Sequence, residues 1–210
     1  MSPGRIIETD EDVSEGATWL AQRDPVLAAA YQATGPLPLR RKPDGFSELF
    51  SAIVSQQVST ASARALWEKL GNAGVLDAQS VQDHSEAALR DLGLSRQKAR
   101  YAHALAEARI DYGALRTASD GDVIKTLTAV TGIGVWTAEI YAMFSLGRAD
   151  VFAPGDLALQ EAARILYDLP ERPKERALRQ MAEAWSPWRS VAARLLFAYY
   201  RHAKQRDGIT

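Results

Sequence analysis

The stretch TGIGVWTAE, residues 131–139, lies between two apolar segments that have helical spacing. Gly132 and Gly134 allow backbone angles and close approaches that other residues do not. Residues 123–146 therefore predict a helix, a short glycine turn and a second helix that begins just after Gly134. An ordinary helical corner would produce the same pattern, as would a surface against which a large partner packs at backbone distance.

The start of the second helix is a candidate anion site. The first N–H groups of a helix have no partner within it, and phosphate is the anion that most often binds there. Gly132 and Gly134 would let a DNA backbone come within hydrogen-bond distance of these amides, and Thr137 would add a hydroxyl. Such a site needs no lysine, which agrees with the formal net charge of −1.

The composition excludes several classes of site. The chain has 210 residues and no cysteine, which removes disulfides, zinc–cysteine sites, iron–sulfur clusters and cysteine nucleophiles. Its three histidines, His84, His103 and His202, are far apart and share no metal-ligand spacing. No apolar run is long enough to cross a bilayer, and the acidic N-terminus lacks a signal-peptide core, so we expect a cytoplasmic protein.

The other apolar segments also repeat at three or four residues, and no segment alternates as a strand would. The sequence therefore predicts an all-α protein of about ten short helices, with residues 35–45 as the flexible linker. Besides the hairpin, the predicted helical segments lie in 17–22, 25–34, 46–57, 60–74, 85–94, 95–113, 156–169, 174–185 and 187–204.

A carboxylate follows the hairpin at a turn. In VFAPGD, residues 151–156, Pro154 and Gly155 fix a turn and Asp156 opens the next helix. An aspartate at this position is common simply as a helix N-cap.

Together, TGIGVWTAE and VFAPGD resemble the helix-hairpin-helix Gly/Pro-Asp superfamily of DNA glycosylases. The resemblance extends from about Phe46 to Tyr200. FSELFSAIVSQQVST (46–60) looks like the early helix and loop of the family, and RDLGLSRQKARYAHALA (90–106) looks like its second DNA-facing turn. AWSPWRSVAARLLFAYY (184–200) resembles the closing helix of the 3-methyladenine DNA glycosylase II (AlkA-like) branch.

The resemblance implies a helix-hairpin-helix glycosylase fold in which two packed helical subdomains enclose the active-site cleft. We expect residues 1–210 to form a single compact catalytic domain. Its subdomains would be residues 1–50 plus 153–210, and residues 51–152. The residues before Phe46 are predicted to be helical, so no N-terminal β domain is expected.

Two features indicate which branch of the glycosylase superfamily the chain resembles. In members that also cut the DNA strand, a lysine after the hairpin glycines attacks the sugar, and here that position corresponds to Trp136. Without an amine no Schiff base forms, which predicts a monofunctional glycosylase that needs no cofactor. The adenine-mismatch and thymine-glycol branches usually carry an iron–sulfur cluster, which a chain without cysteine cannot hold in that way.

By resemblance, Asp156 is the catalytic carboxylate. The resemblance also places Trp136 and Phe197 in the pocket for the flipped base, where an aromatic face attracts a cationic base. Trp188 and Glu139 are further candidates for this pocket. Core packing is the alternative for the tryptophans, and a solvent-facing helix edge is the alternative for Glu139.

The expected DNA contacts extend beyond Gly132, Gly134 and Thr137. Gln57, with Gln56 beside it, matches the wedge that fills the gap left by a flipped base, although a polar helix end would look the same. Ser95 and Lys98 resemble a second phosphate contact, with solvated surface as the alternative for Lys98. In relatives, hairpin carbonyls also bind a monovalent cation, which here would involve Thr128, Val130 and Ile133.

The resulting functional prediction is a monomeric DNA glycosylase of base excision repair. It would act on duplex DNA that contains alkylated purines such as 3-methyladenine and 7-methylguanine, without a membrane partner. A bacterial-type cytoplasmic location is expected, at the nucleoid during repair. Two alternatives stay open at this point: a glycosylase for another lesion class, and a non-catalytic DNA-binding module for which Asp156 is dispensable.

Overall fold

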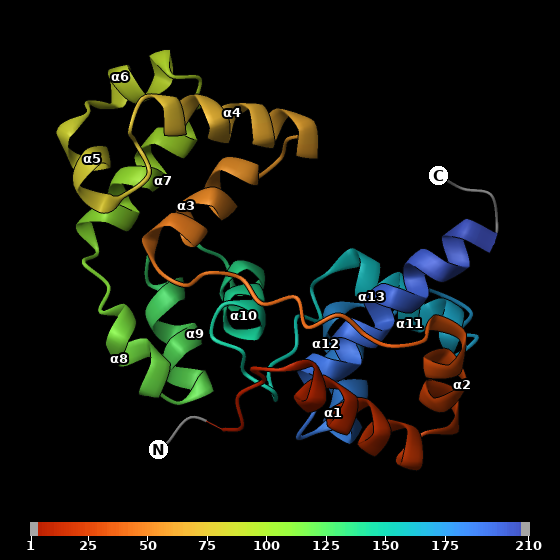
Figure 1. The fold of residues 1–210 in the computed structure, drawn as a ribbon. Helices are drawn as coiled ribbons and strands as arrows, with labels where there is room; N and C mark the ends of the chain where they lie inside the picture. Colours follow the sequence, from red (N-terminus) through yellow and green to blue (C-terminus); the bar gives the residue numbers. More distant parts are fainter. Residues whose placement is uncertain (1–3, 207–210) are drawn as a thin grey trace. The chain divides into compact units, whose positions relative to one another are not determined.

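The computed structural model describes residues 4–206 (Figure 1). Within this range the chain is helical, and its one β feature is an isolated antiparallel bridge between Ile6 and Arg148, which confirms the all-α prediction. None of the described helices combines the length and the apolar character needed to cross a membrane. The helices are α1 (Asp10–Arg23), α2 (Pro25–Thr34), α3 (Phe46–Ser55), α4 (Thr60–Asn72), α5 (Ala78–Asp83), α6 (Glu86–Asp91), α7 (Arg96–Glu107), α8 (Tyr112–Thr117), α9 (Asp120–Thr128), α10 (Val135–Phe144), α11 (Leu157–Leu166), α12 (Glu175–Met181), the 3₁₀ helix η1 (Ala182–Trp185) and α13 (Arg189–Arg206).

Side-chain caps determine where many of these helices begin. Thr9 and Asp12 form a reciprocal capping box at α1, and Asp24 caps α2 directly ahead of Pro25. Serines cap four further helices by accepting a hydrogen bond from a first-turn N–H: Ser59 at α4, Ser85 at α6, Ser95 at α7 and Ser119 at α9.

Two six-residue helices, α5 and α8, were not expected. Residues 95–113 were predicted as one helical segment, but α7 ends at Glu107 and α8 begins at Tyr112. A helix this short shows less than two turns of apolar periodicity, so its sequence signal is mainly the cap. Asp77 at α5 and Asp111 at α8 supply those caps.

The chain divides into two compact units. The first comprises Lys42–Tyr141, and the second combines the residues up to Arg41 with those from Ala142 onward. These bounds differ from the expected ones, which placed all of residues 1–50 in one subdomain and extended the other to residue 152. The reason is packing: α3 lies against α4 and α7, and the Phe144 ring contacts that of Phe197. The predicted cleft between subdomains stays a prediction.

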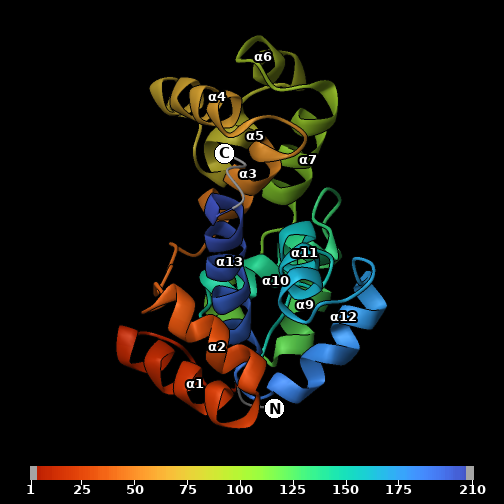
Figure 2. The same cartoon turned by 90° about the vertical axis from the view of Figure 1, so that its right-hand side faces the viewer.

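The first unit has its core around α3 and α7. Helices α3, α5 and α6 all pack on α7, as Figure 2 shows. Phe50 of α3 is fully buried, and its ring lies 5.7 Å from that of Phe46 and 5.5 Å from that of Trp67, centroid to centroid. This core fixes the end of α3, from which the predicted wedge loop follows.

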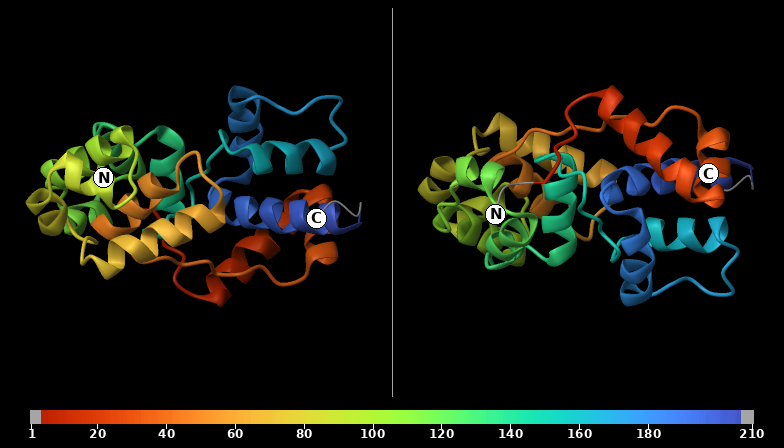
Figure 3. Two further views of the ribbon diagram at one scale, coloured as in Figure 1. Left: turned by 90° about the horizontal axis from the view of Figure 1, so that it is seen from above. Right: turned by 90° about the horizontal axis from the view of Figure 1, so that it is seen from below.

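The second unit is built on α13, which lies beside α1, α2 and α11 (Figure 3). Trp188, just before α13, is buried against α1 with only 3% of its surface exposed. A Cβ atom at Gly16 of α1 would lie 2.6 Å from Cε3 of Trp188. The close approach of these two segments therefore depends on Gly16.

We predict that Gly16→Ala destabilises the protein, because the new methyl group overlaps the Trp188 ring. Overpacking of this kind costs about 1–3 kcal/mol, and urea denaturation measures it. Gly121→Ala in α9 is the matched control, since a Cβ there meets nothing within 4 Å. It should leave the free energy of unfolding unchanged or raise it by up to ~1 kcal/mol. Equal midpoints for Gly16→Ala and wild type would contradict the packing argument.

Candidate active site

The hairpin predicted from TGIGVWTAE is present, with α9 and α10 joined by residues 129–134. The turn is closed by a hydrogen bond from the Ile133 N–H to the Val130 carbonyl, over 3.0 Å. Gly132 has a φ of +100°, and a Cβ there would overlap the Tyr101 side chain on α7. The fold itself therefore requires glycine at position 132.

Gly134 is different, because nothing in the described part of the protein requires it to be glycine. A Cβ at this position would meet no atom within 4 Å, and its φ lies outside the left-handed region. Gly134 is exposed and precedes α10, whose first hydrogen bond runs from the Ala138 N–H to the Gly134 carbonyl. Phosphate binding at the start of α10 stays a prediction.

We predict that Gly134→Ala leaves stability unchanged but weakens binding to duplex DNA. The methyl group would stand where a phosphate must approach, and losing one hydrogen bond to a charged acceptor costs ~1.5 kcal/mol, or about tenfold in Kd. Fluorescence anisotropy with a labelled duplex measures the change. An unaltered Kd would indicate that position 134 lies outside the DNA interface.

The loop after α3 is held from two sides. Lys98 Nζ donates a hydrogen bond to the Val54 carbonyl over 2.7 Å, and Gln56 Nε2 donates to the Gly132 carbonyl over 2.9 Å. Between these anchors and α4, Gln57 is exposed and takes a φ of +55°, which is uncommon for a residue other than glycine. Gln56 thus joins the loop to the hairpin, while Gln57 is the residue that the loop presents to solvent.

Lys98 does not lie where a surface phosphate contact was expected. Its side chain is buried, and burial lowers the pKa of its amine from the ordinary lysine value. Ser95 caps α7 by accepting from the Lys98 N–H and remains exposed. The structure therefore gives Lys98 a supporting role for the loop, and phosphate contact by Ser95 stays a prediction.

We predict that Lys98→Met loosens this loop, because methionine keeps the apolar stem but removes the donor to Val54. The Gln56 amide, which donates to the Ile53 carbonyl, should exchange about tenfold faster, as expected for the loss of ~1.4 kcal/mol of local stability. Hydrogen exchange detects this. Lys125→Met, at an exposed position of α9, is the control and should leave the rate unchanged. The same rate in Lys98→Met would rule out the supporting role.

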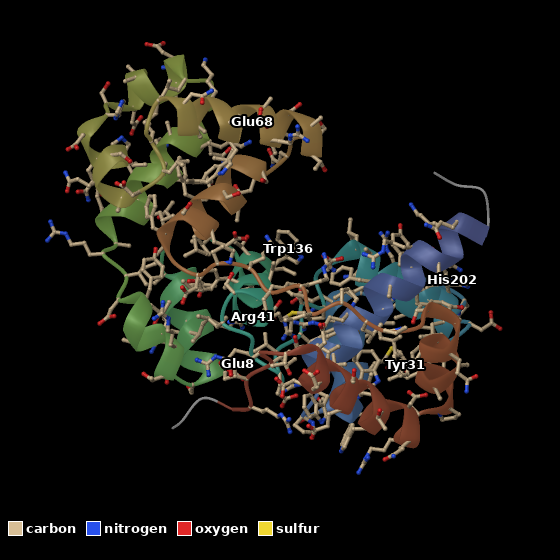
Figure 4. The ribbon with its side chains drawn as sticks, viewed as in Figure 1. Glu8, Tyr31, Arg41, Glu68, Trp136 and His202 are labelled. Atoms are coloured by element: carbon tan, nitrogen blue, oxygen red, sulfur yellow. The ribbon has the colours of Figure 1, made fainter. Side chains whose placement is uncertain are left out.

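A cavity of about 190 Å³ lies within the first unit. Ser51, Ser55 and Gln56 line one part, and Trp136, Thr137 and Tyr141 of α10 line another. Trp136, labelled in Figure 4, is 46% exposed and offers an indole face, whereas Thr137 is buried in the cavity wall. The volume is below that of pockets for drug-sized ligands and suits a small planar group.

Tyr141 and Glu139 differ in their relation to this cavity. The Tyr141 hydroxyl accepts a hydrogen bond from the Gly45 N–H over 2.7 Å, and burial raises its pKa to about 12. Tyr141 is therefore a neutral group that ties α10 to the start of α3. Glu139 is buried on α10, so the solvent-facing alternative is excluded, but it is not among the residues that line the cavity.

Asp156 belongs to the second unit and is the N-cap of α11. Its Oδ1 accepts from the Ala158 N–H over 2.8 Å and from the Leu159 N–H over 3.2 Å. The preceding turn is closed by a hydrogen bond from the Asp156 N–H to the Ala153 carbonyl. Gln160, buried one turn into α11, donates to the Pro154 carbonyl over 2.8 Å. The carboxylate is thus held in one position by its own helix and by a fixed turn.

The second unit also contains Phe197 and Trp188, which differ in exposure. The place of Phe197 in the base pocket stays a prediction. Phe197 is partly exposed, and its ring centroid lies 6.5 Å from that of Phe144. Trp188 is buried against α1, and the guanidinium carbon of Arg5 lies 4.5 Å from its ring centroid. Trp188 is therefore a core residue, and the prediction that it lines the base pocket is wrong.

The hairpin carbonyls predicted to bind a cation belong to Thr128, Val130 and Ile133. Thr128 is the last residue of α9, where helix carbonyls lack intrahelical partners, so it fits this role. The Val130 carbonyl accepts from Ile133 but retains a second lone pair. Cation binding at the hairpin stays a prediction.

Three contributors were not predicted from the sequence: Gln160, Tyr101 and the loop-supporting function of Lys98. Each acts through a contact whose partner is fixed by folding. Of the three, only Gln160 could have been predicted from its position near VFAPGD. It lies one helical turn after Asp156, where a side chain can reach back to the preceding turn.

The chain is also similar to known proteins. Residues 50–187 match the family described as HhH-GPD superfamily base excision DNA repair protein. The chain is 31% identical over 182 residues to DNA-3-methyladenine glycosylase 2 of Escherichia coli, covering 78% of this chain and 60% of that protein.

Two solved structures are also similar. The DNA-3-methyladenine glycosidase of Bacillus halodurans has a TM-score of 0.80 at 33% identity, over 97% of this chain and 95% of that one. The 3-methyladenine DNA glycosylase Mag1 of Schizosaccharomyces pombe, in complex with abasic DNA, has a TM-score of 0.76 at 26% identity, over 87% of this chain and 95% of that one.

Proposed function

Because the chain belongs to the HhH-GPD superfamily of base excision DNA repair proteins, we propose that it is a monofunctional DNA glycosylase that removes alkylated purines. It would hydrolyse the N-glycosidic bond and leave an intact abasic strand. The observation that carries the proposal is the Asp156 carboxylate, which two α11 amides and a fixed turn hold in place. Similarity to enzymes named for 3-methyladenine supports the substrate class.

The chemistry needs few catalytic groups. Alkylation at N3 or N7 of a purine places a positive charge on the base, which makes it a good leaving group without a general acid. As the bond to the sugar breaks, positive charge develops on the sugar, and the Asp156 carboxylate stabilises it electrostatically. The same carboxylate accepts a proton from the attacking water as general base.

Base recognition would draw on aromatic groups. The target base has to leave the duplex stack, and a cationic base is attracted to an aromatic face. The exposed Trp136 indole on its cavity and the partly exposed Phe197 ring are the faces that we assign to this task. Gln57, exposed in a strained conformation, would fill the gap left by the base.

The DNA backbone would bind at the hairpin through the amides after Gly134. Because Trp136 stands where strand-cutting relatives carry lysine, the proposed enzyme forms no Schiff base with the sugar. We further propose action as a monomer on duplex DNA in the cytoplasm, without a required cofactor. A monovalent cation on the carbonyls of Thr128, Val130 and Ile133 would stabilise the hairpin.

One observation favours a second candidate function. The hydrogen bonds of Asp156 to α11 account for this aspartate as an ordinary N-cap, without chemistry. A non-catalytic DNA-binding module would keep the hairpin and use Asp156 only for folding. The two functions therefore differ in what replacement of the carboxylate does to base release.

We predict that Asp156→Asn abolishes activity while preserving the fold, because asparagine caps a helix nearly as well as aspartate. The single-turnover rate of 7-methylguanine release should fall about 10²- to 10⁴-fold, with DNA affinity and thermal midpoint retained. Asp77→Asn, at the N-cap of α5, is the matched control and should keep the wild-type rate. Base release by Asp156→Asn at the wild-type rate would remove Asp156 from the catalytic centre.

A further inference from the structure

Arg40 places a positive charge on the aromatic surface that contains Phe197. Its guanidinium carbon lies 5.0 Å from the Phe144 ring centroid and 5.1 Å from that of Phe197. Both distances are within the range of a cation–π interaction. All three residues belong to the second unit. The side chain of the free protein thus occupies the kind of face that the proposed enzyme would offer to a cationic base.

The position of Arg40 is built into the fold. Its backbone has a φ of +51°, an uncommon conformation that surrounding structure must maintain. The preceding carbonyl, that of Leu39, accepts from Arg194 Nε over 3.1 Å and from Arg194 Nη2 over 2.9 Å. Arg194 is only 1% exposed and also donates to the Ser190 carbonyl. A buried arginine on α13 therefore fixes the segment that presents Arg40.

The surrounding charges are mostly positive. Partial burial lowers the pKa of Arg40, the charge of Arg201 lowers it further, and the charge of Asp156 raises it. Arg194 has its pKa lowered to about 10 by burial, with Arg40 and Arg41 contributing. Arg40 is thus within electrostatic reach of the proposed catalytic carboxylate and has like-charged neighbours. Two cations repel at short range, so a cationic base cannot share the Phe144–Phe197 face with Arg40 without loss of affinity.

We propose that Arg40 is a specificity-determining residue, whose guanidinium occupies the Phe144–Phe197 face and is displaced when a cationic alkylated purine binds. The inference rests on the proposed glycosylase function. Because Arg40 repels a positively charged base but not a neutral one, its presence reduces the advantage of a charged base over a neutral one. Removing the charge of Arg40 should therefore sharpen discrimination in favour of cationic lesions.

The test compares two dissociation measurements on one duplex sequence at one salt concentration. The first is the half-saturating protein concentration for single-turnover release of 7-methylguanine. The second is the Kd for the same duplex with guanine at that position. The first value divided by the second gives a ratio in which the general loss of DNA affinity that follows removal of any arginine cancels. Arg40→Gln should lower the ratio at least fivefold.

Two variants serve as controls. Arg40→Lys keeps a cation and should stay within twofold of the wild-type ratio. Arg41→Gln removes the neighbouring arginine, labelled in Figure 4, whose guanidinium lies against Gly147, and should also stay within twofold. An unchanged or raised ratio in Arg40→Gln, with normal base release, would overturn the role of Arg40 alone. No release of 7-methylguanine by the wild-type protein would overturn the proposed function, and this inference with it.

Discussion

Gly132 is the constraint on which the hairpin and the loop after α3 in the first unit depend. Its left-handed backbone turns the chain from α9 toward α10, and the Tyr101 side chain lies where any Cβ would have to be. Its carbonyl accepts the Gln56 amide, which joins the loop after α3 to the hairpin. One residue thus sets the geometry of two segments that we assign to phosphate binding and to the wedge. A side chain at position 132 would disturb both segments together.

For the carboxylate of Asp156, the observed structural role is compatible with the proposed chemical one. An N-cap aspartate is held by helix amides, and the positive end of the helix favours its negative charge. Those same bonds fix the orientation of the carboxylate, so the proposed reaction needs no reorganisation when positive charge develops on the sugar. Gln160 extends this support by binding the Pro154 carbonyl. Capping and catalysis are therefore compatible tasks for one side chain.

The sequence was most informative where a local pattern carries its own geometry. The hairpin, the cap at Asp156 and the all-α class follow from glycine placement, capping residues and apolar periodicity. It was least informative where a side chain's role depends on a distant partner. Lys98 resembles a surface lysine until folding buries it against Val54, and Trp188 resembles a pocket aromatic until Gly16 brings α1 against it. Arg40 gave no local signal, because its position depends on Arg194, 154 residues further along the chain. The short helices α5 and α8 were missed for another reason, because six residues are too few to show apolar periodicity.

The most direct test of the account identifies what the protein releases from DNA. Duplex DNA treated with a methylating agent would be incubated with the protein, the released bases identified by mass spectrometry, and strand integrity examined before and after alkali. The account predicts free methylated purines and strands that stay intact until alkali cleaves the abasic sites. Absence of released bases despite DNA binding would contradict the glycosylase function. Release accompanied by strand breaks before alkali would contradict the monofunctional mechanism.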